Sequence, residues 1–346
     1  MDSPKNLTFV SDPVSCEFQG SNILLIPEVG LAHLGNLQLA LNYIDFLAGI
    51  GLPIIKFQHH FSIFESSPTE PFRVSHDHFP MSRHNYWEYT DFSDSDWKYI
   101  YSYAHQKGIA FAITPNSRQS AEYVNRFLKP AFWKVGSSDI TNYHLIDFLV
   151  DTDIPIIVST GLANQESLNS LNESYGFSRF IFLSCHSSYP TPLSSFSLER
   201  LRFLSASVNS PNVGLSDHTK GIEASKTSLA VGAKIIEKHF TLNKKMYGPD
   251  HSSSLNPKEL KILVNELKKT EILLGSKIKK SQPCEYLNMR SIRKSIVAKQ
   301  NIRKYQKIDE NMLTAKRPGT GISPMKIKSI TNKLSKKNIK KNEIVK

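Results

Sequence analysis

The chain has 346 residues, of which 40% are hydrophobic and 21% are charged, and its formal net charge is +12. This length allows one large domain and one small domain. No apolar run approaches the roughly 18 residues of a membrane-spanning helix, which argues against any membrane association. The polar N-terminus has no signal-peptide pattern, and the three cysteines (Cys16, Cys185 and Cys284) form no C-x-x-C pair. We therefore expect a cytoplasmic protein without a disulfide framework or a cysteine zinc site.

The positive charge is concentrated near the end of the chain. Residues 287–346 contain 17 Lys and Arg against 3 Asp and Glu, whereas the preceding residues contain 26 against 28. A basic block can indicate nucleic-acid binding, a site for anions, or a lysine-rich surface without a partner. This block has no zinc-ligand spacing, arginine-rich helix or aromatic RNA-binding signature, so no nucleic-acid partner is expected.

Up to about residue 275 the chain repeats one pattern, in which a short apolar run is followed by a longer amphipathic segment. The apolar runs predict eight strands, at residues 22–28, 52–58, 109–114, 132–137, 155–160, 179–185, 212–217 and 233–239. Segments 37–51 and 257–275 have the spacing of amphipathic helices. Eight alternating units of this kind predict an α/β fold, a (β/α)₈ TIM barrel over residues 1–278. A doubly wound open sheet is the less favoured alternative, because no G-x-G-x-x-G follows the first strand.

Two other regions interrupt or follow this pattern. A polar and aromatic insertion between His59 and Asp96 is expected to be a long loop that either contacts substrate or decorates the surface. Residues 279–288 are predicted to form a linker. Residues 289–346 contain strand-like pieces at 295–302 and 312–322 and predict a small β-rich domain. At about 60 residues such a domain is too small to be robust alone, so we expect it to dock on another surface.

Polar or charged residues occur near the carboxyl end of nearly every predicted strand, which is where barrel enzymes place their chemistry. These residues are Glu28, Lys56, Gln58, Thr114, Lys134, Ser137, Ser159, Ser184 (leading to Tyr189), Ser216, His218, Glu237 and His239. Burying unpaired charge is costly, so a random sequence would not place such residues on most strands. The pattern therefore predicts a polar site at this end of the barrel.

His218 and His239 end two successive strands. One strand-end histidine is more often structural, but two at equivalent positions can meet and bind Zn, Mn, Fe, Ni or Co. No H-E-x-x-H motif supplies a third ligand, so such a metal would keep open positions for substrate and could polarise a carbonyl. Lys56 and Lys134, with the nearby hydroxyls, describe a phosphate or carboxylate pocket. A Schiff-base role for either lysine is the alternative.

Several motifs, in order along the chain, carry a resemblance to a known family. They are IPEVGLAHLGN (26–36), IKFQ (55–58), EPFR (70–73), WKVGSSDITNY (133–143), VSTGLA (158–163), YPTP (189–192), GLSDHTKG (214–221), IIEKHF (235–240), GPDHSSSLNPKEL (248–260) and AKRPGTGIS (315–323). The chain resembles the bacterial sialic acid (N-acetylneuraminate) synthases and their relatives that make legionaminic and pseudaminic acids.

That resemblance implies a TIM barrel followed by an antifreeze-like (SAF) domain that is swapped across a homodimer. The implied reaction condenses phosphoenolpyruvate with an N-acetylated amino sugar aldehyde, either N-acetylmannosamine or a 6-deoxy diacetamido analogue. Its products are a nine-carbon 2-keto acid and phosphate, formed with C–O cleavage. A divalent metal is implied as cofactor, usually Mn²⁺, with Mg²⁺ and Co²⁺ as alternatives.

Site roles follow from the resemblance position by position. His218 and His239 correspond to the metal ligands, and Glu28 to the catalytic carboxylate. The phosphoenolpyruvate pocket corresponds to Lys56, Lys134, Thr114, Ser137, Ser159 and Ser216. The sugar contacts correspond to Gln58, Asp139, Tyr189 and Asp250, with Ser187 and Arg73 also placed at substrate. Arg317 corresponds to an arginine sent across the dimer to the acetamido group.

The chain departs from the family pattern at Ala32 and Ser187, where asparagine is usual, and at Asp139, where glutamate is common. These departures concern the identity of the sugar more than the type of reaction. Two other classes remain open: a Schiff-base 2-keto acid aldolase, and a sugar-binding protein on a barrel that has lost catalysis.

Overall fold

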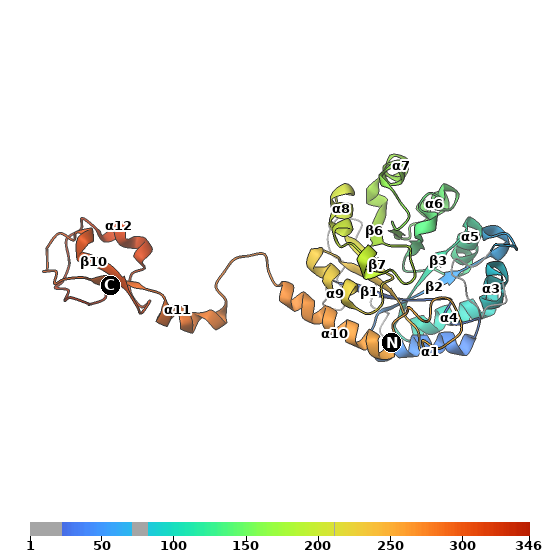
Figure 1. Cartoon of the computed structure of the whole chain (residues 1–346), viewed down its shortest axis with the longest axis horizontal. Coiled ribbons are helices and arrows are strands. Elements are labelled where there is room, and N and C mark those ends of the chain that lie inside the picture. Colours follow the sequence, from blue (N-terminus) through green and yellow to red (C-terminus); the bar gives the residue numbers. More distant parts are fainter. Residues whose placement is uncertain (1–22, 71–81, 211) are drawn as a thin grey trace. The chain divides into compact units, whose positions relative to one another are not determined.

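The structure is a computed structural model of the chain, and it describes residues 23–70, 82–210 and 212–346 (Figure 1). The chain divides into two compact units, Met1–Gly275 and Ser276–Lys346. Across the described ranges, no helix is both long enough and apolar enough to cross a bilayer.

Within the described residues, eight parallel strands of the first unit form a closed barrel in which each strand pairs with the next and β1 pairs with β8. The strands are β1 (Leu24–Gly30), β2 (Ile54–His59), β3 (Ala110–Pro115), β4 (Trp133–Val135), β5 (Ile156–Ser159), β6 (Phe180–Cys185), β7 (Val213–Asp217) and β8 (Ile235–His239). The TIM-barrel prediction is confirmed, and the β1–β8 pairing excludes the open sheet.

Helices surround the barrel, as Figure 1 shows. They are α1 (Leu37–Gly49), α4 (Asp94–Gln106), α5 (Arg118–Phe127), α6 (Tyr143–Val150), α7 (Gln165–Tyr175), α8 (Glu199–Ser207), α9 (Glu223–Ser228) and α10 (Pro257–Leu274). Most of these helices are preceded by a residue whose side chain accepts a hydrogen bond from a backbone N–H of the first turn. That N–H group would otherwise lack a partner within the helix. Asn256 and Glu259 form a reciprocal capping box at the start of α10, with Pro257 at the first helical position.

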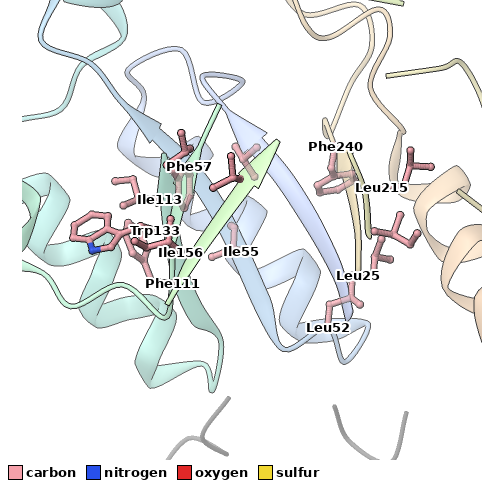
Figure 2. Close-up of a cluster of buried hydrophobic side chains, with 14 of the residues drawn as sticks. Leu25, Leu52, Ile55, Phe57, Phe111, Ile113, Trp133, Ile156, Leu215 and Phe240 are labelled. Carbon is pink, nitrogen blue, oxygen red and sulfur yellow. The ribbon is translucent and has the colours of Figure 1, made fainter. Parts of the chain in front are cut away.

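The barrel strands alternate between two apolar surfaces, because successive side chains of a strand point to opposite faces. The outward side chains, such as Leu25, Phe57 and Trp133, belong to the large core under the helices (Figure 2). The inward side chains form a separate cluster of Leu24, Ile26, Ile54, Ala112, Phe132, Ile157, Leu183 and Ile235. This inner layer closes the barrel below the polar residues at the strand ends.

The insertion after β2 differs from the expected long loop. It contains a one-turn helix, α2 (Ser62–Glu65), and an eight-residue helix, α3 (Arg83–Thr90). Helix α3 begins at Ser82, whose side chain accepts a hydrogen bond from the backbone N–H of Asn85, and it buries Tyr86 and Trp87. The expectation of an irregular segment was therefore wrong for α3. Arg73 lies outside the described residues.

The second unit contains an antiparallel pair, β9 (Ser295–Ala298) and β10 (Leu313–Lys316), in which Leu313 pairs with Ala298. Its own core consists of Ile296, Ala298, Ile302, Ile308, Leu313, Ile339 and Val345. Two short helices, α11 (Tyr286–Ile292) and α12 (Ile327–Ile330), complete it. The predicted linker, residues 279–288, overlaps the beginning of α11, a helix that the sequence pattern did not indicate.

Candidate active site

A polar layer follows the inner apolar layer at the carboxyl end of the barrel. Two residues after an inward-facing apolar residue, the same strand again directs a side chain into the barrel, and here that side chain is polar. Glu28 lies two residues after Ile26, and Lys56 lies two residues after Ile54. The other such residues are Thr114, Lys134, Ser159, Cys185 and Glu237. The period of the strands therefore places these side chains at one level inside the barrel.

These residues line a cavity of about 360 Å³. It brings together thirteen of the candidate residues: Glu28, Lys56, Gln58, Thr114, Lys134, Ser137, Ser159, Ser187, Tyr189, Ser216, His218, His239 and Asp250. Its wall also includes Glu237, which was expected only as a polar strand end, and residues with no role expected from the sequence: Leu31, His60, Arg83, Tyr86, Trp87, Asn116, Gly136, Ser138, Leu162, Cys185 and Pro249.

Lys56 is the centre of the charged group at the bottom of the cavity. Its Nζ lies 2.6 Å from Oε2 of Glu28 and 3.6 Å from Oε2 of Glu237, and it donates to Oγ1 of Thr114 at 2.8 Å. Lys134 donates to Oγ of Ser159 at 2.7 Å and to its neighbouring backbone carbonyl at 2.8 Å. Both lysines are 2% exposed. Two buried ammonium groups ringed by hydroxyls suit an anionic ligand.

The ionisable groups of this layer have opposing pKa shifts. Burial raises the pKa of Glu28, and this effect outweighs the opposing attraction of Lys56. Burial also acts to raise the pKa of Glu237, but Lys134, Lys56 and the Ser216 hydroxyl outweigh it and bring the pKa to about 2. Burial lowers the pKa of Lys134. Of the two carboxyl groups, Glu237 is therefore the ionised one and Glu28 the one better suited to hold a proton.

His218 and His239 face the same cavity, with ring centroids 5.7 Å apart. Nδ1 of His218 lies 2.8 Å from the backbone carbonyl of His186 and donates to it, which leaves Nε2 as the nitrogen with a lone pair. A backbone carbonyl on the other ring nitrogen is how metal-binding histidines are usually oriented. Among the described residues, no group of three or more His, Cys, Asp or Glu side chains is placed to hold a metal. Two imidazoles that face one cavity are a donor set that suits a divalent transition metal, and such a metal would keep its other positions open.

A buried ion pair joins the two strands that carry these histidines. Nζ of Lys238 lies 2.9 Å from Oδ2 of Asp217, and both side chains are at most 1% exposed. Asp217 also accepts hydrogen bonds from Ser225 Oγ at 2.6 Å and from the backbone N–H of Thr219 at 2.8 Å. Asp217 and Lys238 are paired residues in the β7–β8 register, and each immediately precedes a histidine. The pair thus fixes the relative position of the two strand ends.

One wall of the cavity comes from the insertion after β2. The ring of His60 stacks on Trp87 with centroids 4.5 Å apart, and the Arg83 guanidinium lies 4.7 Å from the same Trp87 ring. Arg83 is paired with Glu70 at 2.8 Å. The strand period could have identified Cys185, since it lies two residues beyond Leu183 of the inner layer, and it places Glu237, already named as a polar strand end, two residues beyond Ile235. No sequence signal of that kind marks the residues of α3.

Three candidate residues are not among the described residues that line the cavity. Asp139 is in a short 3₁₀ turn, where its carboxylate accepts hydrogen bonds from Ser138 and from Asn142 at 2.7 and 2.9 Å. Arg317 belongs to the second unit, where its Nε donates to the carbonyl of Ile292 at 3.0 Å. Arg73 is outside the described ranges. On β6, Cys185 lines the cavity instead of the expected Ser184, because Leu183 and Cys185 share the inward face.

Comparison with known proteins assigns the family. Residues 43–279 match the NeuB family, and residues 293–346 match the SAF domain. The chain is 34% identical over 330 residues to N,N'-diacetyllegionaminic acid synthase of Campylobacter jejuni, covering 93% of this chain and 98% of that protein. It is 30% identical over 300 residues to N-acetylneuraminate-9-phosphate synthase of Mus musculus, covering 84% of this chain and 82% of that protein.

Solved structures agree with this assignment. N-acetylneuraminic acid synthetase from Leptospira borgpetersenii, crystallised with citrate, has a TM-score of 0.68 at 29% identity, over 77% of this chain and 90% of that one. A spore coat polysaccharide biosynthesis protein E from Chromobacterium violaceum has a TM-score of 0.81 over 93% of this chain and 98% of that one; at 19% identity it supports the fold alone. The chain belongs to the NeuB family and carries a SAF domain.

Proposed function

We propose that this protein condenses phosphoenolpyruvate with an N-acetylated amino sugar aldehyde, producing a nine-carbon 2-keto acid and inorganic phosphate. The observation that carries the proposal is the composition of the polar layer, where two buried lysines and several hydroxyls lie in one cavity with a pair of histidines. The relatives named as legionaminic, pseudaminic and N-acetylneuraminate-9-phosphate synthases support the same class of product.

Phosphoenolpyruvate is the anionic substrate that we assign to the lysines. Lys56 and Lys134 would neutralise its carboxylate and phosphate, and Thr114, Ser137, Ser159 and Ser216 would donate hydrogen bonds to the same oxygens. The ionised Glu237 balances part of the lysine charge when no substrate is bound. Neither lysine needs to form a covalent bond in this scheme.

The acceptor sugar would lie above this anion pocket. Gln58, Tyr189 and Asp250, which line the upper cavity, are the proposed contacts, and we place Ser187 at the boundary between the two substrates. His218 and His239 would hold a divalent metal, in the first instance Mn²⁺, whose Lewis acidity polarises a carbonyl oxygen. Holding both substrates in line can lower the barrier by roughly 7–11 kcal/mol in favourable cases.

The proposed bond changes are as follows. C3 of phosphoenolpyruvate attacks the aldehyde carbon, forming the C–C bond and leaving cationic character at C2. Glu28, whose pKa is raised by burial, first gives its proton to the alkoxide oxygen formed from the aldehyde. Water then adds at C2, oriented by the Glu28 carboxylate, and returns one proton to it. The tetrahedral centre collapses to the keto group as the bridging C–O bond breaks, and its hydroxyl proton leaves with the phosphate.

Phosphate release tests this proposal directly. Purified protein with Mn²⁺ is assayed with phosphoenolpyruvate labelled with ¹⁸O at the bridging oxygen, against N-acetylmannosamine, its 6-phosphate and the 6-deoxy diacetamido sugars. We expect acceptor-dependent release of phosphate that contains the label, because the C–O bond breaks. Label retained in the keto acid would contradict C–O cleavage, and absence of release with every acceptor would contradict the synthase function.

The same preparation distinguishes the two alternatives. Borohydride reduction in the presence of pyruvate should leave Lys134 unmodified, whereas a Schiff-base aldolase would be trapped covalently there. A barrel without catalytic activity would bind an acetylated aldose in calorimetry but release no phosphate. The lowered pKa of Lys134 makes the trapping experiment informative, because a deprotonated amine is what an aldolase would require.

A further inference from the structure

A hydrogen-bonded chain runs from the insertion into the polar layer. Nδ1 of His60 lies 2.5 Å from Oε2 of Glu65, and Nε2 of His60 lies 3.2 Å from Oε1 of Gln58. Nε2 of Gln58 donates to Oε1 of Glu28 at 2.9 Å, and Glu28 pairs with Lys56. The His60 and Glu65 side chains are only 5% and 3% exposed. The chain therefore links a buried dyad, outside the candidate residues, to the carboxyl group that we assign to proton exchange.

The pattern of donors fixes the orientation of each group along this chain. Asn116 Nδ2 is also 3.2 Å from Nε2 of His60, but it donates to the backbone carbonyls of His59 and Thr114 at 3.2 and 3.4 Å, which uses both of its hydrogens. The Gln58 oxygen and the Glu65 carboxylate can only accept, so the form of His60 that makes both bonds is the imidazolium ring, with a hydrogen on each nitrogen. With its oxygen held by His60, the Gln58 amide must turn its nitrogen toward Glu28.

Glu65 is itself held in place from a second side. Its Oε1 accepts hydrogen bonds from the backbone N–H of Phe61 at 2.7 Å and from Ser117 Oγ at 3.4 Å, so only Oε2 is directed at His60. The His60 ring is also restrained by its stack on Trp87. On the other side of Gln58, Gly30 has a φ of +56°, and a Cβ there would lie 3.3 Å from both Gln58 Nε2 and Glu28 Oε1. The backbone thus leaves just enough room for the amide in this orientation.

We propose that His60, held by Glu65, is a positioning residue that fixes the Gln58 amide and so selects an acceptor oxygen on the sugar. This inference rests on the proposed function, in which Gln58 contacts the acceptor. One N–H of the Gln58 amide is used by Glu28, and the second is available to an oxygen of the sugar. If the amide could rotate, it would present its oxygen to Glu28 and to the sugar for part of the time, and the binding contact would be weakened.

Substitutions at His60 separate positioning from packing. His60→Phe keeps a ring against Trp87 but removes both donors, and we expect the KM for the acceptor sugar to rise by about tenfold. The KM for phosphoenolpyruvate should stay within about twofold, because the lysines are unchanged. His60→Gln restores one donor and should recover part of the loss. Ser62→Ala, two residues after His60 at the start of helix α2 and not among the residues that line the cavity, is the control, with unchanged KM values.

A measurement without substrate tests the positioning in the resting protein. Protein with ¹⁵N-labelled histidine should show two imidazole N–H resonances from one ring, slow to exchange with water and absent in His60→Phe. Glu65→Gln should shift the Nδ1–H resonance and raise the acceptor KM. Equal increases of both KM values in His60→Phe, or the absence of these resonances in the wild-type protein, would overturn the positioning proposal. If the wild-type protein releases no phosphate, the proposed function fails and the resonances alone decide the positioning proposal.

Discussion

Glu28 and Glu237 face the same lysine but hold protons differently. Glu237 is near both Lys56 and Lys134 and accepts from the Ser216 hydroxyl, so its pKa falls to about 2 despite burial. For Glu28, burial and the repulsion of Glu237 outweigh the attraction of Lys56, so its pKa rises. The balance between burial and the nearby charges therefore separates a carboxylate that acts as a counter-ion from a carboxyl group that can exchange a proton.

Two other buried residues, His33 and His59, make the stability of the protein depend on pH. Burial lowers the pKa of His33 and of His59 to about 3, with the nearby charge of His60 contributing. In the unfolded chain a histidine has a pKa near 6.5, so between pH 6.5 and pH 3 the unfolded state binds more protons. Stability from these residues is therefore present above pH 6.5 and is lost as the pH falls through this window.

We expect each of these histidines to lower the free energy of unfolding by about 2 kcal/mol between pH 7 and pH 5. Urea unfolding at the two pH values measures the difference. His59→Gln should reduce the loss by about 2 kcal/mol, because glutamine does not titrate. His144→Gln, on the exposed side of α6, should leave it unchanged. A loss of the same size in His59→Gln and the wild-type protein would contradict the assignment.

At the scale of elements, the buried Asp217–Lys238 ion pair holds the carboxyl ends of β7 and β8 together. Removing one partner leaves a buried charge without a counter-charge, which costs about 3–5 kcal/mol, whereas replacing both by apolar residues can be nearly neutral. We expect Asp217→Asn to destabilise the protein by that amount in urea unfolding. The double variant Asp217→Leu with Lys238→Met should recover most of the loss.

Metal binding by the same variants provides the second measurement. Asp217→Asn should weaken Mn²⁺ binding by about 10- to 100-fold in calorimetry, which is the usual effect of disturbing groups that orient metal ligands. His239→Ala, which removes a proposed ligand, is the reference for complete loss. Mn²⁺ affinity unchanged in Asp217→Asn, with stability reduced, would restrict the ion pair to a structural role.

The elements also show which features a sequence pattern can predict. The eight strands were predictable because each contains a short, nearly continuous apolar run, as in Ile54, Ile55 and Phe57 of β2. Helix α3 was missed because its sequence, RHNYWEYT, mixes polar and aromatic residues; its Tyr86 and Trp87 are buried by tertiary contacts. The orientation of the Asp139 side chain could not be predicted either, because a residue in a 3₁₀ turn follows neither the period of a strand nor that of an α-helix.

At the scale of the whole molecule, the basic block near the end of the chain lies within the second of the two compact units. The described basic residues of Ser276–Lys346 belong to a unit with its own apolar core. We propose that this unit acts in trans, with Arg317 of one subunit completing the cavity of another in a homodimer. An exposed arginine, held at Nε by the Ile292 carbonyl, retains donors for an acetamido oxygen.

Mixing two inactive variants tests this proposal. His239→Ala disables the barrel of one subunit, and Arg317→Ala disables the contribution of the other. After subunit exchange, about half of the dimers are mixed and each has one intact site, so about a quarter of wild-type activity should return. Each variant alone should stay at its low baseline. No recovery after verified exchange would show that Arg317 does not act across subunits.

The wall formed by His60, Arg83, Tyr86 and Trp87 comes from one continuous stretch of chain, whereas the lysines, carboxylates and paired histidines come from separate strands. A single insertion or recombination event between β2 and α4 can therefore replace this wall without moving a strand. His60, which we propose to position Gln58, belongs to this stretch, whereas the proposed sugar contacts Gln58, Tyr189 and Asp250 come from three other parts of the barrel. Exchanging this stretch would change what holds the Gln58 amide in place, while the lysines, carboxyl groups and paired histidines would keep their positions on the strands.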